Sequence, residues 1–401
     1  MTESVFGSRD FRLFYFGQAA SYIGDGLRTI ALPLLVFKIT GSALNLGLTY
    51  ALEWWSFGLF SLVGGSLADR VNRKHLMIVC DVLRFAIILT FAVGYRSGWL
   101  TLPLLYSGIV LHAICGAIFN GGQASSIPYV VGKMRATRAV AVLAATESAV
   151  TTVSTPFGGA LFGLIGPLPA LLVNAVTYLA SVASLGAVRD LGPEETGSLP
   201  RLGHIAEDVG IGFRFLFADR AMRLVSFASL AGNFVGFIEY TALVPFIKRD
   251  LGGTDFSVGI AFGAIGAGSV LGSILAPRLR TSFGKIVIAG YVLGWILYIP
   301  VAFTHNFTVA AVALFLGAIS SGAYITHVLS WRMRVIPEDT VGRVFGAVRL
   351  LVLLGTMPGA LIGGAMADAF GARTTIIAAL VLWLGPVIFV CSNRTIRAEA
   401  R

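Results

Sequence analysis

The chain has few charged residues: Asp, Glu, Lys and Arg make up only 12% of its 401 residues, about half of the ~25% usual in soluble domains. Hydrophobic residues make up 56%, and the mean hydropathy is +0.83. This composition excludes a single water-soluble core, and it also excludes a disordered chain. Apolar runs of about 20 residues recur along the whole length, and each can cross a ~30 Å hydrocarbon layer as a helix. The sequence therefore predicts an all-α, polytopic membrane protein.

Cysteine is also scarce, and its placement excludes a disulfide framework. The three cysteines, Cys80, Cys115 and Cys391, all fall in apolar runs without a CxxC spacing. We interpret them as small buried apolar residues and expect no metal or redox site. The first twelve residues contain Glu3 and Asp10, so we expect no cleavable signal peptide.

Motifs of the common enzyme classes are missing from the sequence. There is no HExxH, no GxSxG, no Walker A sequence and no GxGxxG, so we predict neither an enzyme nor a bound cofactor. Without a nucleotide site, any active transport has to be driven by an ion gradient.

Twelve spans account for the apolar runs, and a polar stretch from Arg189 to Arg223 separates the sixth from the seventh. This stretch contains an amphipathic segment near Ile205–Phe217, and we interpret it as a linker between two halves: 1–190, the linker 191–221, and 222–401. The predicted spans are 13–36, 44–67, 76–96, 102–122, 139–165, 168–188, 222–247, 256–277, 285–304, 308–329, 344–367 and 372–391.

The net charge of +10 is explained by topology. With twelve spans, 22 of the 30 Lys and Arg residues fall on the side that holds both chain ends and the linker, and five fall on the other side. The positive-inside rule then places both termini on the cytoplasmic side of the membrane. We expect this membrane to be the inner (plasma) membrane of the cell. We therefore expect no nucleic-acid partner.

The second half of the chain resembles the first at a constant offset of 212 residues. Shared Gly and Pro positions mark kinks and close helix contacts, so the matches indicate an internal duplication. Because six is an even number of spans, both copies face the same way, with a pseudo-two-fold axis along the membrane normal. The matching pairs are Gly24 and Gly236, Thr29 and Thr241, Pro33 and Pro245, Gly41 and Gly253, Gly47 and Gly259, and Ser61 and Ser273.

The loop after the second span carries a recognisable motif. Residues 64–74 read GGSLADRVNRK, which resembles the cytoplasmic loop signature G-x-L-A-D-R-x-G-R-K of the major facilitator superfamily. Asn72 replaces the second Gly, a mild departure because Asn tolerates the same left-handed turn. The fifth span reads Thr155-Pro156-Phe157-Gly158-Gly159, which is similar to the antiporter motif G-P-x-x-G-G of that family.

Within that superfamily, the pattern is closest to the drug-efflux branch with macrolide exporters and the enterobactin exporter. The matching pieces include Gly24-Asp25 in the first span, Asp81-x-x-Arg84 in the third, and Gly342-Arg343 before the eleventh. The resemblance implies the major facilitator fold, a small-molecule substrate and protons as the coupling partner, in a monomer. The fourth span lacks the Arg of the proton-linked exporter motif and offers only His112.

Ionisable side chains in the spans are the first candidates for function, because each costs roughly 2.5–3.5 kcal/mol to insert. Asp25 shares one helix face with Arg28 and Ser21, which suggests a proton or substrate site; a static Asp25–Arg28 pair is the alternative. Glu239 lies near the repeat position of Asp25 and is a second candidate coupling group.

Five further residues complete the proposed coupling or substrate cavity. Glu53 precedes Trp54 and Trp55, a combination that could hold an amphipathic cation, and Glu147 is comparable. His112 and His327 could relay protons, and Tyr324 lies at helical spacing from His327. For the histidines, simple hydrogen bonds between helices are the alternative.

The loop motif suggests a gate. By resemblance, Asp69 would pair with charges of the other half in one access state, together with Gly65, Arg70 and Arg73, while Asp81 and Arg84 would support this cluster. The alternative is that these charged residues only set the membrane topology, as the positive-inside rule describes. Pro156, Gly158 and Gly159 would form a close-packed surface between helices.

The sequence thus predicts a secondary active exporter of hydrophobic or amphipathic small molecules, working by alternating access and proton antiport. One alternative is an exporter of a defined metabolite, such as a siderophore, or of a lipid. Another, of a different class, is a receptor or scaffold that uses the fold without transport; the several acids within the spans argue against it.

Overall fold

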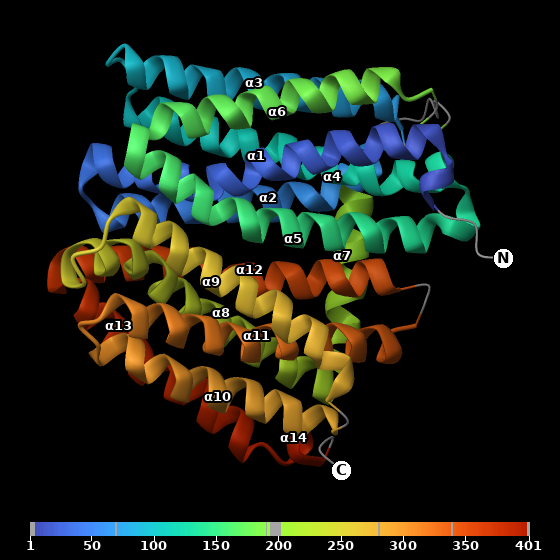
Figure 1. The fold of residues 1–401 in the computed structure, drawn as a ribbon. Helices are drawn as coiled ribbons and strands as arrows, with labels where there is room; N and C mark the ends of the chain where they lie inside the picture. Colours follow the sequence, from blue (N-terminus) through green and yellow to red (C-terminus); the bar gives the residue numbers. More distant parts are fainter. Residues whose placement is uncertain are drawn as a thin grey trace. The chain divides into compact units, whose positions relative to one another are not determined.

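The computed structural model describes residues 5–68, 70–189, 191–192, 202–279, 281–337 and 340–398, and this part of the chain is built from helices without a strand. The helices of the first half are η1 (Val5–Gly7), α1 (Arg9–Thr40), α2 (Ala43–Ala68), α3 (Arg73–Arg96), α4 (Leu102–Val131), α5 (Lys133–Ile165) and α6 (Pro167–Ala187) (Figure 1). Those that follow are α7 (Leu202–Ala218), α8 (Arg220–Pro245), η2 (Phe246–Asp250), α9 (Asp255–Leu275), η3 (Ala276–Arg278), α10 (Phe283–Phe303), α11 (Phe307–Val335), α12 (Val341–Phe370), α13 (Ala372–Ser392) and α14 (Arg394–Ala398).

Twelve of these helices are long enough to span a membrane. Among the described residues, ten pass as candidate spans by length and hydropathy. The other two are α1, with 32 residues, and α2, with 26. At 1.5 Å per residue both exceed a ~30 Å hydrocarbon layer, and their sequences include Asp25, Arg28 and Glu53. The predicted all-α, twelve-helix membrane fold is confirmed.

Contacts divide the chain into two units. Unit 1 consists of Met1–Leu35 and Leu52–Ile205, and unit 2 of Val36–Ala51 and Ala206–Arg401. The end of α1 and the beginning of α2 therefore pack with the second group of helices, although they belong to the first six in the sequence. The domain boundary at 191–221 stays a prediction.

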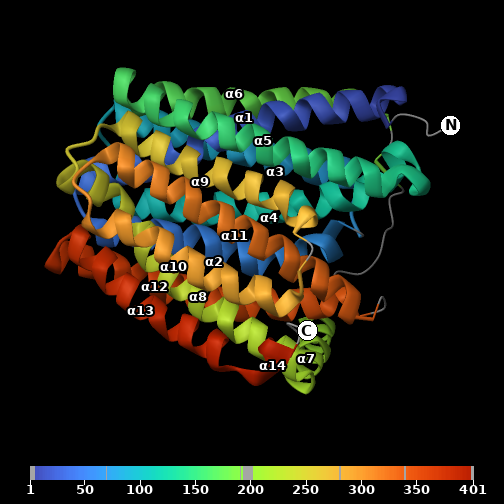
Figure 2. The same cartoon turned by 60° about the horizontal axis from the view of Figure 1, so that its bottom comes forward.

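Unit 1 is held together by close helix contacts at small residues. In this unit α3 packs against both α4 and α6, and Figures 1 and 2 show α6 running alongside the other helices of the unit. A Cβ atom on Gly158 of α5 would lie 2.9 Å from Leu27 Cα of α1, and one on Gly26 would lie 3.1 Å from Thr151 Cα of α5. Without a hydrophobic driving force between helices in lipid, such small-residue contacts let backbones approach and gain van der Waals energy.

In unit 2, the strongest example is a row of glycines on α12. Gly355, Gly359 and Gly363 follow each other at four-residue spacing, so they lie on one face of the helix. Each meets the backbone of α8, at Leu230, Phe234 and Ile238 respectively. The row predicts the tight α8–α12 pair that the contacts show.

The repeat seen in the sequence is also present in the helix ends. Ser42 and Thr254, 212 residues apart, occupy the same position before α2 and α9. The Asn45 amide donates to Ser42 Oγ, and the Ser257 amide donates to Thr254 Oγ1, both at 3.3 Å. Equivalent positions thus carry equivalent N-caps, which satisfy a free amide at each helix start.

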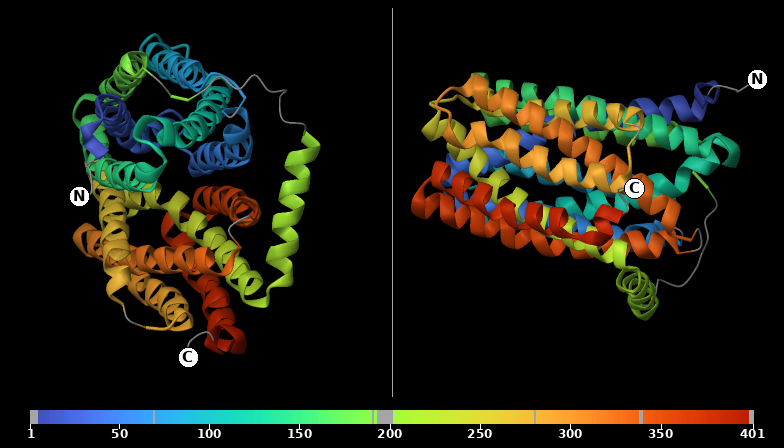
Figure 3. Two further views of the ribbon diagram at one scale, coloured as in Figure 1. Left: turned by 90° about the vertical axis from the view of Figure 1, so that its right-hand side faces the viewer. Right: turned by 90° about the horizontal axis from the view of Figure 1, so that it is seen from below.

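The predicted amphipathic segment before the seventh span forms helix α7. It lies crosswise to the spanning helices of unit 2 (Figure 3). Gly212 of α7 packs against the backbone of Arg343 and the side chain of Ala347 on α12. This contact ties the helix to unit 2.

Candidate functional site

Asp25 of α1 is the centre of a buried group of charged and polar side chains in unit 1. Arg84 of α3 donates from Nη2 to both carboxylate oxygens, at 3.1 and 3.0 Å. The Tyr178 hydroxyl of α6 donates to Asp25 Oδ1 at 2.6 Å. Arg28 Nε lies 3.8 Å from the same oxygen. Side chains of α1, α3 and α6 thus contact Asp25. Of these contacts, the predicted one with Arg28 is the longest.

Arg84 joins two carboxylates. Its Nη1 donates to Asp81 Oδ1 at 3.3 Å, and its guanidinium lies 4.2 Å from the centre of the Tyr178 ring. Asp81 is fully buried and Arg84 is 7% exposed. The sequence motif placed both residues with the gate. Arg84 pairs with Asp25 and Asp81, and a role of this pair in the gate stays a prediction.

Tyr178 also connects Asp25 to His112 of α4, whose Nε2 lies 2.9 Å from the Tyr178 oxygen. Because Tyr178 uses its only hydroxyl proton on Asp25, its oxygen has to accept a hydrogen bond from His112. The imidazole therefore carries its proton on Nε2. These contacts form a continuous line of hydrogen bonds from His112 to Asp25.

Arg28 makes a second, separate pair with Glu53 of α2, with Nη1 and Oε1 2.8 Å apart. The carboxylate proposed as a cation site beside Trp54 and Trp55 is therefore already neutralised by an arginine. We refer to Asp25, Arg28, Glu53, Asp81, Arg84, His112 and Tyr178 together as the charge network.

The local sequence explains how the charge network is assembled. Asp25 and Arg28 are three residues apart, as are Asp81 and Arg84, so each pair lies on one helix face. Gly24 lies directly beside Asn174 and Thr177 of α6, where a side chain would collide with both. This close approach of α1 and α6 brings Tyr178 within reach of Asp25.

Glu147 of α5 belongs to unit 1 but not to the charge network. Its side chain is exposed, and its backbone oxygen accepts a hydrogen bond from Thr151 at 2.6 Å. Its role as a coupling group stays a prediction.

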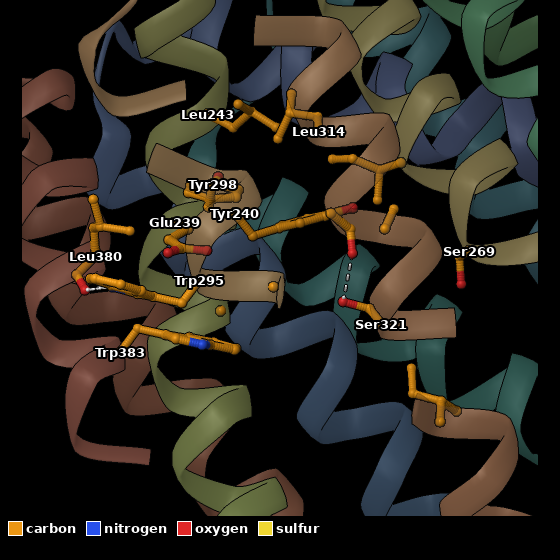
Figure 4. A pocket seen from close by; sticks show the side chains of 16 residues that line it. Glu239, Tyr240, Leu243, Ser269, Trp295, Tyr298, Leu314, Ser321, Leu380 and Trp383 are labelled. Atoms are coloured by element: carbon orange, nitrogen blue, oxygen red, sulfur yellow. Dashed lines mark hydrogen bonds between the residues drawn. The ribbon is translucent and has the colours of Figure 1, made fainter. Parts of the chain in front are cut away.

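Unit 2 contains a cavity of about 320 Å³ between α8, α9, α10, α11 and α13 (Figure 4). Glu239 lines it together with Tyr240, Trp295, Tyr298 and Trp383. We refer to this space as the aromatic cavity. Among the described residues, Glu239 has no hydrogen-bond or ion-pair partner, so it differs from Asp25 and Glu53.

Tyr324 and His327 of α11 lie outside the aromatic cavity. The Tyr324 hydroxyl contacts Ser229 Oγ at 3.0 Å and the Tyr291 hydroxyl at 3.4 Å, and the residue lines a second, apolar cavity of about 560 Å³. His327 Nδ1 lies 2.9 Å from the backbone oxygen of Ala323 in its own helix. The structure therefore does not bring these two residues to Glu239.

The proposed gate is described only in part, because Asp69 lies outside the described residues. Gly65 belongs to α2. Arg70 donates its backbone amide to Leu67 at 3.1 Å. Arg73 Nε donates to the Ala68 oxygen at 3.1 Å, and its guanidinium lies 4.9 Å from the centre of the Tyr129 ring. Arg73 thus covers the end of α2.

Asn72 does not use the left-handed turn that its residue type tolerates. Its φ is −58°, and its side chain accepts a hydrogen bond from the His75 amide at 3.0 Å. Asn is a favoured residue at this position because its oxygen satisfies a free amide of the first turn. The substitution for Gly therefore supplies an N-cap to α3.

In the helix-packing motif, Gly158 meets Leu27 of α1, and both Gly158 and Gly159 are buried. Pro156 lies inside α5. Within the described residues, no three His, Cys, Asp or Glu side chains gather as they would to hold a metal ion.

Sequence reasoning missed the partners that lie far away along the chain. Tyr178 gave no signal, since a single Tyr in an apolar run usually packs in the core. The aromatic cavity was also missed, because its side chains come from three different helices: Tyr240 from α8, Trp295 and Tyr298 from α10, and Trp383 from α13. Only Glu239, an acid in an apolar span, could be found.

Comparison with known proteins shows one family over most of the chain. The Major Facilitator Superfamily model matches residues 14–360. The chain is 24% identical over 413 residues to the multi-drug resistance efflux pump PmrA homolog of Lactococcus lactis, covering 98% of this chain and 95% of that protein. It is 22% identical to the multidrug efflux pump Tap of Mycobacterium tuberculosis, over 91% of this chain and 89% of Tap.

Solved structures share the fold. A bacterial homologue of the human lysosomal transporter Spinster superposes with a TM-score of 0.73 at 18% identity, over 98% of both chains. The nucleoside transporter NupG superposes with a TM-score of 0.73 at 11% identity, over 96% of this chain and 99% of NupG.

Proposed function

Because the chain belongs to the Major Facilitator Superfamily, a family of membrane transporters, we propose that it is a secondary active exporter driven by proton antiport. Relatives that are named multidrug efflux pumps extend over nearly its whole length. They support hydrophobic or amphipathic small molecules as its substrates. The excess of basic residues beside the chain ends supports cytoplasmic termini in the plasma membrane.

The charge network is the observation that carries this proposal. It contains three carboxylates, Asp25, Glu53 and Asp81, but only two guanidinium groups, those of Arg28 and Arg84. With the carboxylates ionised and His112 neutral, one negative charge has no counter-charge in the network. An uncompensated charge is costly in a membrane interior, so binding of one proton stabilises the network.

We propose Asp25 as the carboxylate whose protonation is coupled to transport. Protonation of Asp25 would weaken its pairs with Arg84 and Arg28, and so change the attraction between α1 and α3. A transporter that alternately opens to each side of the membrane can use such a change to favour one state when protonated. The line from His112 through Tyr178 provides a hydrogen-bonded route to Asp25.

Alternating access is supported by the internal repeat. Two six-helix repeats with a common orientation can rock against each other around a site near the middle of the membrane, as described for transporters of this architecture. We assign no state of that cycle to the structure.

The test is transport in proteoliposomes with an imposed pH gradient and a panel of charged and uncharged dyes. We expect the wild-type protein to concentrate dyes against their gradient. Asp25→Asn keeps the shape of the side chain but loses the titrating group, so it should allow downhill movement and lose uphill transport.

Asp10→Asn, at the first turn of α1, is the matched control and should behave like the wild-type protein. If Asp25→Asn still concentrates dye at the wild-type rate, Asp25 is structural. If a ligand screen finds one metabolite and no dyes, the protein is a specific exporter instead. Binding without transport of any ligand would favour a receptor.

A further inference from the structure

A groove runs along the surface of unit 2 between α10 and α11, which pack side by side (Figures 1 and 2). It is the apolar cavity of about 560 Å³ that Tyr324 lines. Leu279, Leu293 and Leu316 also line it, and they are 46%, 47% and 40% exposed. In a membrane protein, apolar side chains that are exposed at the surface meet lipid. We refer to this space as the α10–α11 groove.

The length of the groove matches one leaflet of a bilayer. Lys285 lines one end, and Leu297, twelve residues further along α10, lines the other. At 1.5 Å per residue this distance is about 18 Å, whereas one leaflet is about 15 Å deep, half of a ~30 Å hydrocarbon layer. The groove is therefore long enough to hold an acyl chain from the headgroup region to the middle of the membrane.

The polar side chains inside the groove are already satisfied by unit 2. The Tyr324 hydroxyl contacts Ser229 Oγ and the Tyr291 hydroxyl, and Ser320 Oγ donates to the Gly290 oxygen at 3.2 Å. The walls therefore offer few free hydrogen-bonding groups to a ligand. Such walls favour a plain hydrocarbon chain over a molecule with polar groups along its length.

Positive charge is confined to one end of the groove. Lys285 is exposed there, and Arg278, next to Leu279, is exposed as well. Arg278 donates to the Ile274 oxygen of its own turn at 3.0 Å. The ion pairs among the described residues use other basic groups, so both charges can attract an anion from outside the protein.

The opposite end continues into a hollow of a different character. This hollow has a volume of about 290 Å³, shares Leu297 and Leu316 with the groove, and has no charged residue in its lining. The α10–α11 surface thus has a basic end and an apolar end. The positive-inside rule predicts that the basic end faces the cytoplasm, where the leaflet is rich in anionic lipids.

We propose that the α10–α11 groove binds an anionic phospholipid of the cytoplasmic leaflet, with one acyl chain along the groove and the headgroup phosphate at Lys285 and Arg278. The apolar walls hold the chain, and the basic end selects a headgroup with net negative charge. The site lies within unit 2 and requires neither a transported substrate nor a gradient, so it goes beyond the proposed function.

The test is native mass spectrometry of the purified full-length protein in detergent, titrated with phosphatidylglycerol or with phosphatidylcholine carrying the same acyl chains. We expect the protein to retain phosphatidylglycerol at lower lipid concentrations than phosphatidylcholine. Lys285→Gln should weaken phosphatidylglycerol binding about fivefold, the contribution of one Lys near an anionic lipid, and leave phosphatidylcholine unchanged. Lys133→Gln, at an exposed lysine that begins α5 in unit 1, is the matched control and should bind like the wild-type protein.

A second variant tests the apolar walls. Ala289 is exposed and lines the groove, so Ala289→Trp fills the space for the chain and should weaken the binding of both lipids severalfold. Val381→Trp on α13, where the side chain is 60% exposed and lies outside the groove, is its control and should leave both affinities unchanged. Gel filtration and thermal unfolding without added lipid check that each variant is folded.

Three results overturn the proposal. The first is equal retention of the two lipids by the wild-type protein, or wild-type phosphatidylglycerol affinity in folded Lys285→Gln. The second is displacement of the lipid by an equal concentration of glycerol phosphate, because a headgroup without chains would then bind as well as the lipid. The third is a mass of two protein chains that Ala289→Trp reduces to one, which would identify a second copy of the chain as the occupant.

Discussion

Arg84 is buried between two carboxylates and an aromatic ring in unit 1. It is 7% exposed, donates to both Asp25 and Asp81, and covers the ring of Tyr178. A guanidinium serves this purpose because its donors form a flat fork that can reach two carboxylates at once, whereas a lysine offers one compact ammonium group. The stability of the charge network therefore depends on this residue.

We predict that Arg84→Ala destabilises the protein by about 3–5 kcal/mol, the usual cost of leaving a buried charge without its partner. The double variant Arg84→Ala/Asp25→Asn removes a charge of each sign and should recover part of this loss. Thermal unfolding in detergent measures both. Equal stability of the single variant and the wild-type protein would contradict the buried network.

At this scale, the sequence predicts contacts within a helix better than contacts between helices. Asp25 and Arg28 were placed on one face from their spacing alone, and their atoms lie 3.8 Å apart. The shorter contacts of Asp25, with Arg84 and Tyr178, join residues 59 and 153 positions apart. No periodicity within one helix carries that information, because it depends on how α1, α3 and α6 pack.

At the scale of elements, the beginning of α2 is capped by a residue of α12. Asp368 accepts hydrogen bonds from the Ser42 hydroxyl at 2.5 Å and from the amides of Ala43 and Leu44 at 2.7 and 3.0 Å. A carboxylate here satisfies free amides and opposes the positive end of the helix dipole. Gly364, one turn earlier on α12, lets the two backbones meet at Ala43 and Leu44.

We therefore predict that Asp368→Ala lowers the free energy of unfolding by about 1–2 kcal/mol, as expected for the loss of a helix cap. Asp368→Asn keeps an acceptor and should lose less. Thermal unfolding of the two variants and of the wild-type protein provides the ranking, and an Asp368→Ala protein as stable as the wild type would refute it.

Helix positions were largely predictable because apolar runs and the 212-residue offset both locate them. The ends were less predictable: α4 continues to Val131 and α5 begins at Lys133, well beyond the predicted spans 102–122 and 139–165. Hydropathy detects the part of a helix in lipid, while polar turns outside it remain helical through their backbone hydrogen bonds.

At the scale of the whole molecule, twelve spans fix the side of the membrane on which each loop lies. We predict that single cysteines at Thr196 and Thr254 react with a membrane-impermeant maleimide from opposite faces. Thr196 lies in the predicted linker, outside the described residues, and Thr254 precedes α9. The background should lack Cys80, Cys115 and Cys391, which are free thiols. Labelling of both positions from one face would exclude the twelve-span topology.

The assignment of Val36–Ala51 to unit 2 has a consequence for how the chain can be divided. A cut in the linker would separate the first six spanning helices from the last six, yet the second fragment would lack a hairpin against which its own α12 packs. Neither fragment is then a complete folding module, even though the sequence predicts that each carries one copy of an internal repeat. The hairpin makes the second half dependent on the first.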